Sequence, residues 1–293
     1  MKVAAIIIAF NRNELLKRAI QAIQGQSRQV DSILVVDNAK LSSTRKLCLK
    51  MQTKYIQGDE SWGSAGGFAR GISEAIDLGF EYLWLLDDDG YPDRDCLSVL
   101  LKALNSEAFD LVSPLSISQE DLEETSNTYW INLCRSTKVK VLIRKEFRTN
   151  QVQFYNGVLM RRSVPNSIGL PNIQLFMRGD EMDYYFRCKK NGIRMTLCTR
   201  ALFFHPSSAS EYQMSRQILF SANIPTDPKK RYYQFRNRGF LAREYRLILT
   251  SIFDFIRYPI AFIFFNRCDW QGLRKWLKLW WAGFTRKLEN NSV

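Results

Sequence analysis

Histidine is almost absent from this chain of 293 residues, and its cysteines do not occur in close pairs. The single histidine, His205, excludes a histidine-rich zinc site, and no Cys-x-x-Cys motif is present. Scattered thiols of this kind are typical of a reduced, cytoplasmic protein. The first residues lead directly into a strand-like segment, without the successive regions of a signal peptide, so none is expected. The cysteines lie at positions 48, 96, 134, 188, 198 and 268.

The composition is that of a globular protein with an excess of positive charge. Apolar residues make up 46% and charged residues 24%, and there is no internal repeat or low-complexity tract. The length allows one large domain with an appendage, or two small domains. The formal net charge is +13, and the residues from Glu211 to the end hold 15 Lys/Arg against 6 Asp/Glu. A basic tail indicates lipid headgroups, nucleic acid or a phosphorylated substrate as partner, or else a solvated surface.

Short apolar runs alternate with helical patterns along the first third of the chain. Val3 to Phe10 is rich in β-branched residues and predicts a strand buried on both faces. Asn13 can cap a helix, and Gly63 to Gly67 open another that continues through Ala75. This β-α-β-α order predicts an α/β fold with a mostly parallel sheet and helices on both faces. Further strands are expected at 32–36, 54–57, 82–86, 111–112, 154–160 and 195–204, helices at 97–104 and 180–191, and a β-hairpin insertion within 116–150.

Three consecutive carboxylates follow the predicted strand at 82–86. Ligands of such sheets bind at the carboxyl ends of the strands, where Asn11, Asp37 and the Asp87–Asp89 cluster fall. Adjacent carboxylates repel one another, and a hard divalent cation such as Mg²⁺ or Mn²⁺ compensates them. Alternate residues of an extended chain point the same way, so Asp87 and Asp89 form an Asp-x-Asp pair. His205, also at a predicted strand end, lies where a third metal ligand would help. The alternative interpretation of the three carboxylates is a solvated acidic turn.

A second acidic cluster, Asp180-Glu181-x-Asp183, opens the predicted helix at 180–191. Acidic side chains stabilise helix N-termini, which could explain one of them. A carboxylate here could also be the general base that deprotonates an acceptor hydroxyl. The glycine-rich segment at 63–67 favours an anion at a helix N-terminus, but it matches neither the P-loop nor the dinucleotide fingerprint.

The last 80 residues differ in character from the rest. Leu247 to Phe265 is strongly apolar, but Asp254, Arg257 and Pro259 interrupt it, so a continuous membrane span is not expected. The helix that follows places aromatic side chains between cations, which is typical of a membrane interface or of a helix packed on the core. Its residues are Trp276, Leu277, Trp280, Trp281 and Phe284, among Arg274, Lys275, Lys278, Arg286 and Lys287.

Four motifs in this order resemble the family 2 glycosyltransferases of the GT-A fold, over roughly residues 1–245. Segments similar to those of bacterial members are Tyr155–Arg162 and Arg231-Tyr232-Tyr233-x-Phe235-Arg236-Asn237-Arg238. The four motifs are Ala9-Phe10-Asn11-Arg12, Val35-Val36-Asp37-Asn38, Leu85-Leu86-Asp87-Asp88-Asp89 and Gly179-Asp180-Glu181-x-Asp183.

The resemblance implies roles for individual residues. Asp89, with Asp87 and His205, would bind Mn²⁺ or Mg²⁺ beside the diphosphate of the donor, and Asp37 would contact the nucleotide. The catalytic base would be the second acid of the Asp180-Glu181 pair; many relatives carry Asp there, so both Glu181 and Asp180 stay open. The residues expected to bind the nucleotide sugar are Phe10, Asn11, Arg12, Asp37, Gly66, Gly67, Asp87 and Asp88.

Within the family, Gly63-Ser64-Ala65-Gly66-Gly67-Phe68 resembles the glycine-rich stretch of galactofuranosyltransferases more than that of rhamnosyltransferases, although Ser64-Ala65 and Trp62 depart from it. The resemblance therefore implies an inverting transfer of galactofuranose from UDP-galactofuranose to a polysaccharide or lipid-linked glycan, with dTDP-rhamnose as the alternative donor. The expected organisation is a GT-A domain at 1–245 and an amphipathic helical extension at 246–293, peripheral at the inner face of the cell membrane. A homo-oligomer is compatible with the sequence.

Other classes of protein explain fewer of these features. A nucleic-acid-binding protein would explain the charge, but two acidic clusters would repel phosphate, so no nucleic-acid partner is expected. A two-metal nuclease would leave the glycine-rich segment and the tail without a role. A nucleotidyltransferase usually has a glycine-rich basic loop directly after the first strand, where this chain has Phe10-Asn11-Arg12-Asn13. A non-catalytic scaffold stays open.

Overall fold

The computed structural model describes residues 1–106, 109–131, 134–213, 222–266, 268–285 and 288, and it forms two compact units. Unit 1 comprises Met1–Ile173 and Tyr184–Ser207, and unit 2 comprises Gln174–Asp183 and Ser208–Val293. This division differs from the predicted boundary at 245/246 because helix α8 (Pro228–Glu244) packs along α10 (Trp270–Thr285). A catalytic domain at 1–245 with an extension at 246–293 stays a prediction about function.

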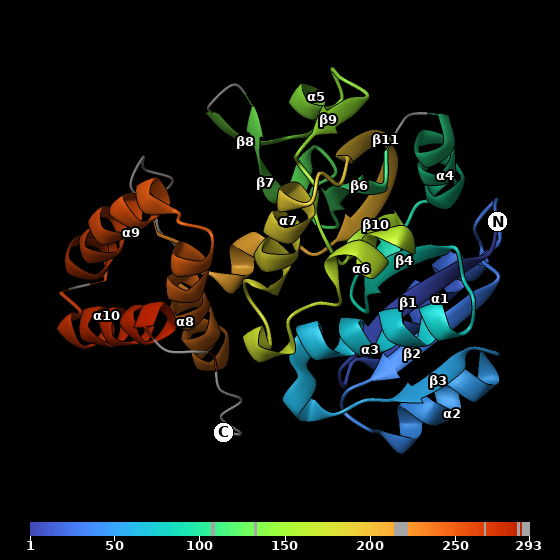
Figure 1. The fold of residues 1–293 in the computed structure, drawn as a ribbon, viewed down its shortest axis with the longest axis horizontal. Coiled ribbons are helices and arrows are strands. Elements are labelled where there is room, and N and C mark those ends of the chain that lie inside the picture. Colours follow the sequence, from blue (N-terminus) through green and yellow to red (C-terminus); the bar gives the residue numbers. More distant parts are fainter. Residues whose placement is uncertain (107–108, 132–133, 214–221, 267, 286–287, 289–293) are drawn as a thin grey trace. The chain divides into compact units, whose positions relative to one another are not determined.

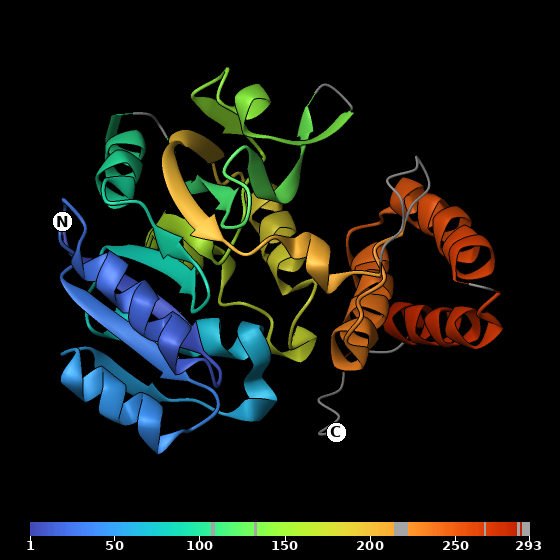
Figure 2. The same cartoon turned by 180° about the vertical axis from the view of Figure 1, so that it is seen from behind.

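The sheet of unit 1 has the strand order β3-β2-β1-β4-β10-β6-β11-β5 (Figures 1 and 2). β1 pairs in parallel with both β2 and β4, and β2 with β3, as the β-α-β-α order predicts. β10 lies antiparallel between β4 and β6, so the sheet is mixed beyond its first four strands. The strands are β1 (Val3–Ala9), β2 (Ser32–Asp37), β3 (Lys54–Gln57), β4 (Tyr82–Asp87), β5 (Tyr91–Pro92), β6 (Leu111–Ser118), β7 (Glu124–Ile131), β8 (Cys134–Lys138), β9 (Phe147–Thr149), β10 (Asn156–Arg161) and β11 (Met195–His205).

Helices cover both faces of this sheet, which is why β1 is apolar throughout. Ile7 faces a core completed by α1 (Asn13–Gln24), α2 (Ser42–Lys50) and α4 (Cys96–Ser106). Ile6 faces the opposite core, to which α3 (Gly63–Asp77), α6 (Ser163–Ile168) and the later part of α7 (Asp180–Lys190) contribute. α1 lies in front of the strands in Figure 2 and α3 in front of them in Figure 1. This unit also contains α5 (Val139–Leu142), and the first four residues of α7 belong to unit 2.

The glycine-rich segment opens α3, as predicted, and lets this helix lie close to the sheet. A Cβ atom on Gly71 would collide with the Ile6 side chain, and one on Gly67 would lie 2.7 Å from Ile8 Cγ2. Larger residues would therefore push α3 away from β1. The packing of the helix alone is a sufficient reason for glycine at these two positions.

Asn13 does not cap α1 as the sequence suggested. It is the first helical residue, and Arg12 stands at the cap position without a capping side-chain bond. The Asn13 amide instead donates to Ser43 Oγ at 2.8 Å, and its carbonyl accepts from Thr44 Oγ1 at 2.8 Å. The side chain thus links α1 to α2.

The predicted hairpin insertion is confirmed by the antiparallel pair of β7 and β8.

Unit 2 contains α8, α9 (Ile248–Ile260), a π-helical segment (Ala261–Phe265) and α10, drawn orange to red in Figure 1. α8 and α10 cross at two glycines: a Cβ on Gly239 would collide with the Trp280 carbonyl, and one on Gly283 with the Arg236 carbonyl. The two backbones therefore touch, which only glycine at both crossing points allows.

The tryptophans of α10 do not all face outward, contrary to one of the two sequence interpretations. Trp276 and Trp280 are buried with Phe235, Tyr258 and Phe262, whereas Trp281 is 60% exposed. Arg286 and Lys287 lie outside the described residues. Among the described residues of this unit, α9 carries a series of exposed apolar side chains: Ile248, Leu249, Ile252, Phe253, Phe255 and Ile256.

The apolar segment Ile248–Phe265 is, among the described residues, the one helical stretch long and apolar enough to cross a membrane by length and composition. The core helices of soluble proteins also meet this criterion. A continuous span was not expected from the sequence, yet the helical stretch runs through Asp254. This carboxylate is buried and accepts hydrogen bonds from Arg238 at 2.7 and 2.6 Å and from Arg257 at 3.0 Å. This charged contact ties one face of α9 to α8, and Pro259 lies inside the helix.

Candidate metal and donor site

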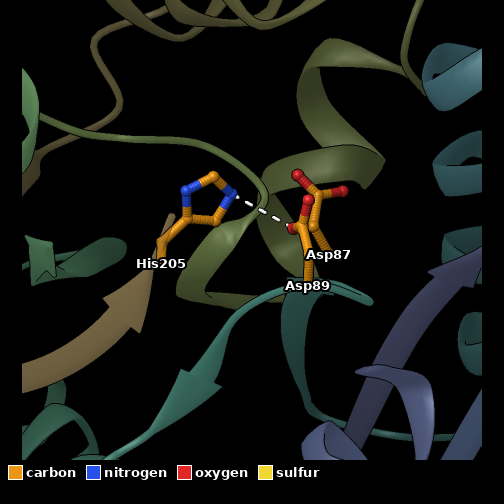
Figure 3. A group of neighbouring side chains, drawn as sticks. All are labelled: Asp87, Asp89 and His205. Atoms are coloured by element: carbon orange, nitrogen blue, oxygen red, sulfur yellow. Dashed lines mark ion pairs between the residues drawn. The ribbon is translucent and has the colours of Figure 1, made fainter. Parts of the chain in front are cut away.

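The carboxyl ends of β4 and β11 bring Asp87, Asp89 and His205 together (Figure 3). Asp87 ends β4, Asp89 follows in the turn, and His205 ends β11. One ligand atom from each residue lies within 4.8 Å of the other two. Octahedral bonds of about 2.1 Å place neighbouring ligands about 3 to 4 Å apart, so small side-chain rotations suffice to bind an ion. The predicted Asp-x-Asp pair and its histidine partner thus form one group, and Asp87, Asp89 and His205 are together called the metal group.

The hydrogen bonding of His205 suits a metal ligand. Its Nδ1 lies 2.8 Å from the Pro206 carbonyl oxygen, which only accepts, so Nδ1 carries the proton. Nε2 then points at Asp89 Oδ1, at 3.2 Å, and must either bind a proton or face a cation with its lone pair. Burial opposes the charged ring, but Asp89 and Asp87 outweigh it and raise the pKa of His205 to about 9.

Positive charge at this edge falls short of the three carboxylates. Arg12 forms ion pairs with Asp88, at 2.5 Å, and with Asp89. Burial raises the pKa of Asp88 to about 6, although Arg12 opposes the rise. Burial would also raise the pKa of Asp89, but His205 and Arg12 hold it below its ordinary value. Among the described residues, Arg12 and a protonated His205 thus face three acids. If His205 gave up its Nε2 proton to bind a divalent ion, the ion and Arg12 together would match the three carboxylate charges.

Asp88 turns into the protein while its neighbours form the metal group. Its side chain is fully buried, and Oδ2 accepts a hydrogen bond from the Phe10 N–H at 3.0 Å. Asp88 therefore joins the end of β1 to the end of β4. Asn11 adopts a left-handed backbone with φ 55°, a conformation that asparagine tolerates better than most residues. That turn brings Arg12 to the carboxylates; contacts of Phe10, Asn11 and Asp88 with a donor stay predictions.

Asp37 ends β2, and its buried carboxylate shapes the turn that follows. It accepts hydrogen bonds from the N–H groups of Ala39 at 3.1 Å and Leu41 at 2.8 Å, and from the Tyr55 hydroxyl at 3.3 Å. Its contact with a nucleotide stays a prediction. Asn38, which belongs to the motif at 35–38 but received no predicted role, donates to the Gly63 carbonyl at 2.7 Å and so anchors the start of α3.

Gly66 and Gly67 are buried in α3, where a Cβ would meet Trp62, or Ile8 and Asn38, within 3.0 Å. The structure thus explains both glycines by packing, and their contact with a donor stays a prediction. A structural role of Asn38 could have been predicted from the sequence, because this residue directly follows Asp37 at the same strand end.

Gln119 is a second residue that sequence reasoning missed. Its Nε2 donates to the carbonyl oxygens of Asp89 at 3.0 Å and Phe204 at 3.3 Å, and its own N–H donates to the His205 carbonyl at 3.2 Å. Gln119 therefore links the two backbone segments that present the metal group. It lies in the 116–150 stretch, whose polar sequence offers no periodic signal for such a contact.

The second acidic cluster opens α7 and belongs to unit 2, whereas the metal group belongs to unit 1. Asp180 and Asp183 are buried, and Glu181 is exposed. The Tyr245 hydroxyl donates to Asp183 Oδ1 at 2.7 Å. Of the three acids, Glu181 is the one whose side chain reaches solvent.

A parallel-centred α/β sheet with an Asp-x-Asp pair and a histidine at its carboxyl edge defines the GT-A class of transferases that use nucleotide sugars. Residues 4–164, more than half of the chain, match the family model described as "Glycosyl transferase family 2". The chain belongs to this family and is a glycosyltransferase. The fold class and the family resemblance predicted from the sequence are confirmed.

Curated relatives match the chain over nearly its whole length. It is 30% identical over 291 residues to "Galactofuranosyltransferase GlfT1" of Mycolicibacterium smegmatis, covering 94% of each chain. The protein of the same name from Mycobacterium tuberculosis is 29% identical, covering 94% of this chain and 93% of that protein. "Low-salt glycan biosynthesis hexosyltransferase Agl10" of Haloferax volcanii is 26% identical, covering 92% and 83%. The predicted resemblance to galactofuranosyltransferases is thereby confirmed.

Solved structures share the fold at low sequence identity. "S. aureus TarS 1-349" is 13% identical with a TM-score of 0.58, covering 97% of this chain and 81% of that one. The chain spans 37% of the longer TarS structure. "GalNAc-T7 with UDP, GalNAc and Mn2+" is 13% identical with a TM-score of 0.59, covering 84% and 50%. These likenesses concern the fold alone.

Proposed function

We propose that this chain is an inverting, metal-dependent glycosyltransferase that moves galactofuranose from UDP-galactofuranose to a polysaccharide or lipid-linked glycan. The observation that carries the proposal is the Asp87, Asp89 and His205 group, in a chain related over 94% of its length to a protein named as a galactofuranosyltransferase. The GT-A structure of GalNAc-T7, solved with UDP and Mn²⁺, supports a nucleotide sugar and a divalent ion as its ligands.

Asp87, Asp89 and His205 would hold Mn²⁺ or Mg²⁺ at the carboxyl edge of the sheet. When bound there, the ion supplies Lewis-acid stabilisation of the leaving diphosphate. Arg12 lies beside the acids with its side chain 44% exposed, so its guanidinium can turn from Asp89 to phosphate oxygens and bind two of them. The Arg12 guanidinium, which pairs with the carboxylates in this structure, would thus bind the diphosphate of the donor.

Glu181 is the proposed catalytic base. It takes the proton of the acceptor hydroxyl as this oxygen attacks the sugar carbon from the face opposite the diphosphate. The carbon gains oxocarbenium character, as in glycoside hydrolysis, and a single displacement inverts it. Only one catalytic carboxylate is needed because no covalent sugar intermediate forms. The exposure of Glu181 and the burial of Asp180 support Glu181, and Asp180 is the alternative.

A thermal-shift titration with UDP, dTDP, GDP and CDP, each with and without Mn²⁺, tests the donor. A ligand that binds only the folded state raises its stability, so the nucleotide of the donor will raise Tm in the presence of Mn²⁺. A shift selective for UDP supports the proposal. A shift selective for dTDP would replace it with a rhamnosyltransferase, and folded protein without any shift would refute nucleotide-sugar transfer.

The base is tested with Glu181→Gln, which keeps the shape of the side chain and removes its basic oxygen. We expect unchanged UDP and Mn²⁺ binding and a loss of transfer of about 100-fold or more, the usual scale of general base catalysis. Asp180→Asn is the matched comparison on the same turn. Full activity of Glu181→Gln together with inactive Asp180→Asn would assign the base to Asp180.

We further propose that the chain is cytoplasmic and binds peripherally to the inner face of the cell membrane through residues 246–293. The support is the exposed apolar surface of α9, together with the exposed cations Arg274, Lys275 and Lys278 of α10. Apolar side chains enter the boundary between headgroups and acyl chains, and cations bind anionic lipid headgroups. A homo-oligomer stays a prediction, which light scattering of the purified protein will test.

A further inference from the structure

The backbone just before α7 is held in an unusual conformation. Phe176, Arg178 and Gly179 all have positive φ, at 65°, 59° and 121°. The left-handed region is unfavourable for a residue with a side chain, so two such residues within three positions are unfavourable by themselves. Such backbone persists only where its surroundings fix it, and it is frequent at functional sites. The contacts that hold this segment in its conformation therefore point to a functional role.

Asn237 of α8 supplies three of those contacts from its side-chain amide. Its Nδ2 donates to the carbonyl oxygens of Leu175, Met177 and Arg178 at 2.9, 2.8 and 2.9 Å. Its Oδ1 accepts from Arg236 Nε at 2.9 Å. Carbonyls only accept and a guanidinium only donates, so the amide can have just this orientation. The side chain is fully buried, and every polar atom of it is committed.

Neighbours of Asn237 on the same helix hold the same segment. Arg236 Nη2 donates to the Gln174 carbonyl at 2.7 Å, and the Tyr233 ring stacks on Phe176 with centroids 4.5 Å apart. Gly179 faces Asn237, whose Cβ would lie 3.0 Å from a Cβ added there. The segment Arg231–Arg238, singled out by its similarity to family members, is thus the surface on which residues 174–179 are built.

The first turn of α7 begins directly on this segment. The Asp183 N–H donates to the Gly179 carbonyl at 2.9 Å, which closes the turn that contains Asp180 and Glu181. Glu181 is two residues from Gly179, so the direction of its side chain depends on the backbone angles that Asn237 fixes. A catalytic carboxylate misplaced by about 1 Å loses roughly 100-fold in rate.

We propose that Asn237 is a positioning residue of the transfer reaction, which fixes residues 175–179 and thereby the acidic turn that opens α7. The proposal rests on the function proposed above, in which Glu181 takes the proton of the acceptor. Asn237 touches neither substrate nor ion in this role; it acts through the backbone that carries the acid. Its loss therefore lowers kcat and leaves binding of the donor in place.

Asn237→Asp is the test variant, because it keeps the shape and replaces the donor group with an oxygen that faces three carbonyls. Gln234→Glu is the matched control: Gln234 lies on the same helix and its Nε2 donates to the Asn223 carbonyl at 2.6 Å. The transfer rate would be measured as UDP release from UDP-galactofuranose, with the cell's lipid-linked glycans as acceptor. If Asn237→Asp does not fold, Asn237→Ala removes the donor without adding charge.

We expect Asn237→Asp to lower kcat roughly 100-fold with the KM for the donor within about threefold of the wild type. Amide hydrogen exchange should accelerate at residues 175–180 and stay unchanged in α9 and α10. In a Glu181→Gln background the same substitution should have no further effect on kcat, because residues acting as a unit are not additive.

Three results would overturn the proposal: kcat equal to that of Gln234→Glu, faster exchange throughout unit 2, or, where Glu181→Gln by itself lowers kcat, a full additional loss from Asn237→Asp in that background. Full activity of Glu181→Gln alone refutes the proposed base and leaves the role of Asn237 separately measurable. In that case a local increase of exchange at 175–180 with a specific fall in kcat still supports Asn237 as the residue that positions this turn.

Discussion

Gln119 links the two backbone segments that present the metal group, and its replacement tests how that group is held. In Gln119→Ala the Nε2 bonds to the Asp89 and Phe204 carbonyls are lost. The backbone bond from the Gln119 N–H to the His205 carbonyl is retained, so β6 and β11 keep their register. The substitution therefore loosens the ends of β4 and β11 relative to each other without removing a ligand.

The size of the effect follows from these two bonds. Each neutral hydrogen bond contributes about 0.5–1.5 kcal/mol net, so about 1–3 kcal/mol is lost. A factor of ten in affinity corresponds to about 1.4 kcal/mol. If this energy serves to hold the ligands in place, the Kd for Mn²⁺ will rise about 5- to 140-fold. The same range is seen where groups that orient metal ligands are removed, about 10- to 100-fold.

The assay is calorimetric titration of Mn²⁺ into the protein with UDP present. Gln24→Ala is the control, because Gln24 also donates from Nε2 to a carbonyl, that of Met51, at 2.8 Å and on the protein surface. We expect its Kd for Mn²⁺ to equal that of the wild type. An unchanged Kd in Gln119→Ala would refute the idea that this side chain holds the metal ligands in place.

Three further predictions concern the ion, the helices of unit 2 and the membrane. Asp89→Ala should abolish the Mn²⁺-dependent thermal shift with UDP, and an undiminished shift would disprove its role as a ligand. Gly283→Ala should lower the free energy of unfolding in urea by about 2–3 kcal/mol, because its Cβ collides with the Arg236 carbonyl. Gly25→Ala, whose Cβ has no atom closer than 3.3 Å, should cost less, and equal losses would contradict the close helix crossing. Replacing Ile252 and Phe253 of α9 together by serine should weaken binding to anionic vesicles by about 100-fold or more, since each buried apolar side chain contributes about 1.5–3 kcal/mol. Leu49→Ser, on a still more exposed residue of α2, is the control, and an equal loss in both proteins would exclude α9 as the membrane surface.

Local pattern was sufficient for the centre of the fold. β1, β2 and β4 are buried on both faces, so their sequences are uniformly apolar and end abruptly in polar residues. The alternation of an extended chain predicts that Asp87 and Asp89 point away from Asp88, and the structure brings these two side chains together with His205 in a group that could hold a metal ion. Such signals are readable because each residue's environment repeats along its own strand.

Contacts between distant segments left no such signal. The antiparallel placement of β10 between β4 and β6 depends on the whole sheet, and a strand of six residues does not encode its direction. Trp276 and Trp280 alternate with cations as interfacial tryptophans do, yet α8 and α9 cover them. Periodicity shows which face of a helix is apolar and cannot show whether protein or lipid covers it.

The sequence by itself determined the α/β class, the family and the acids and histidine that gather at the strand ends. Its motifs suffice because those residues must stand where particular strands end. The tertiary structure was needed to show which polar side chains hold distant segments in place. Gln119 acts at the strand ends and Asn237 at the segment before α7, across 30 and 62 residues of chain, through side-chain hydrogen bonds to backbone carbonyls. A carbonyl is present at every residue, so nothing in the sequence marks the ones that are bound.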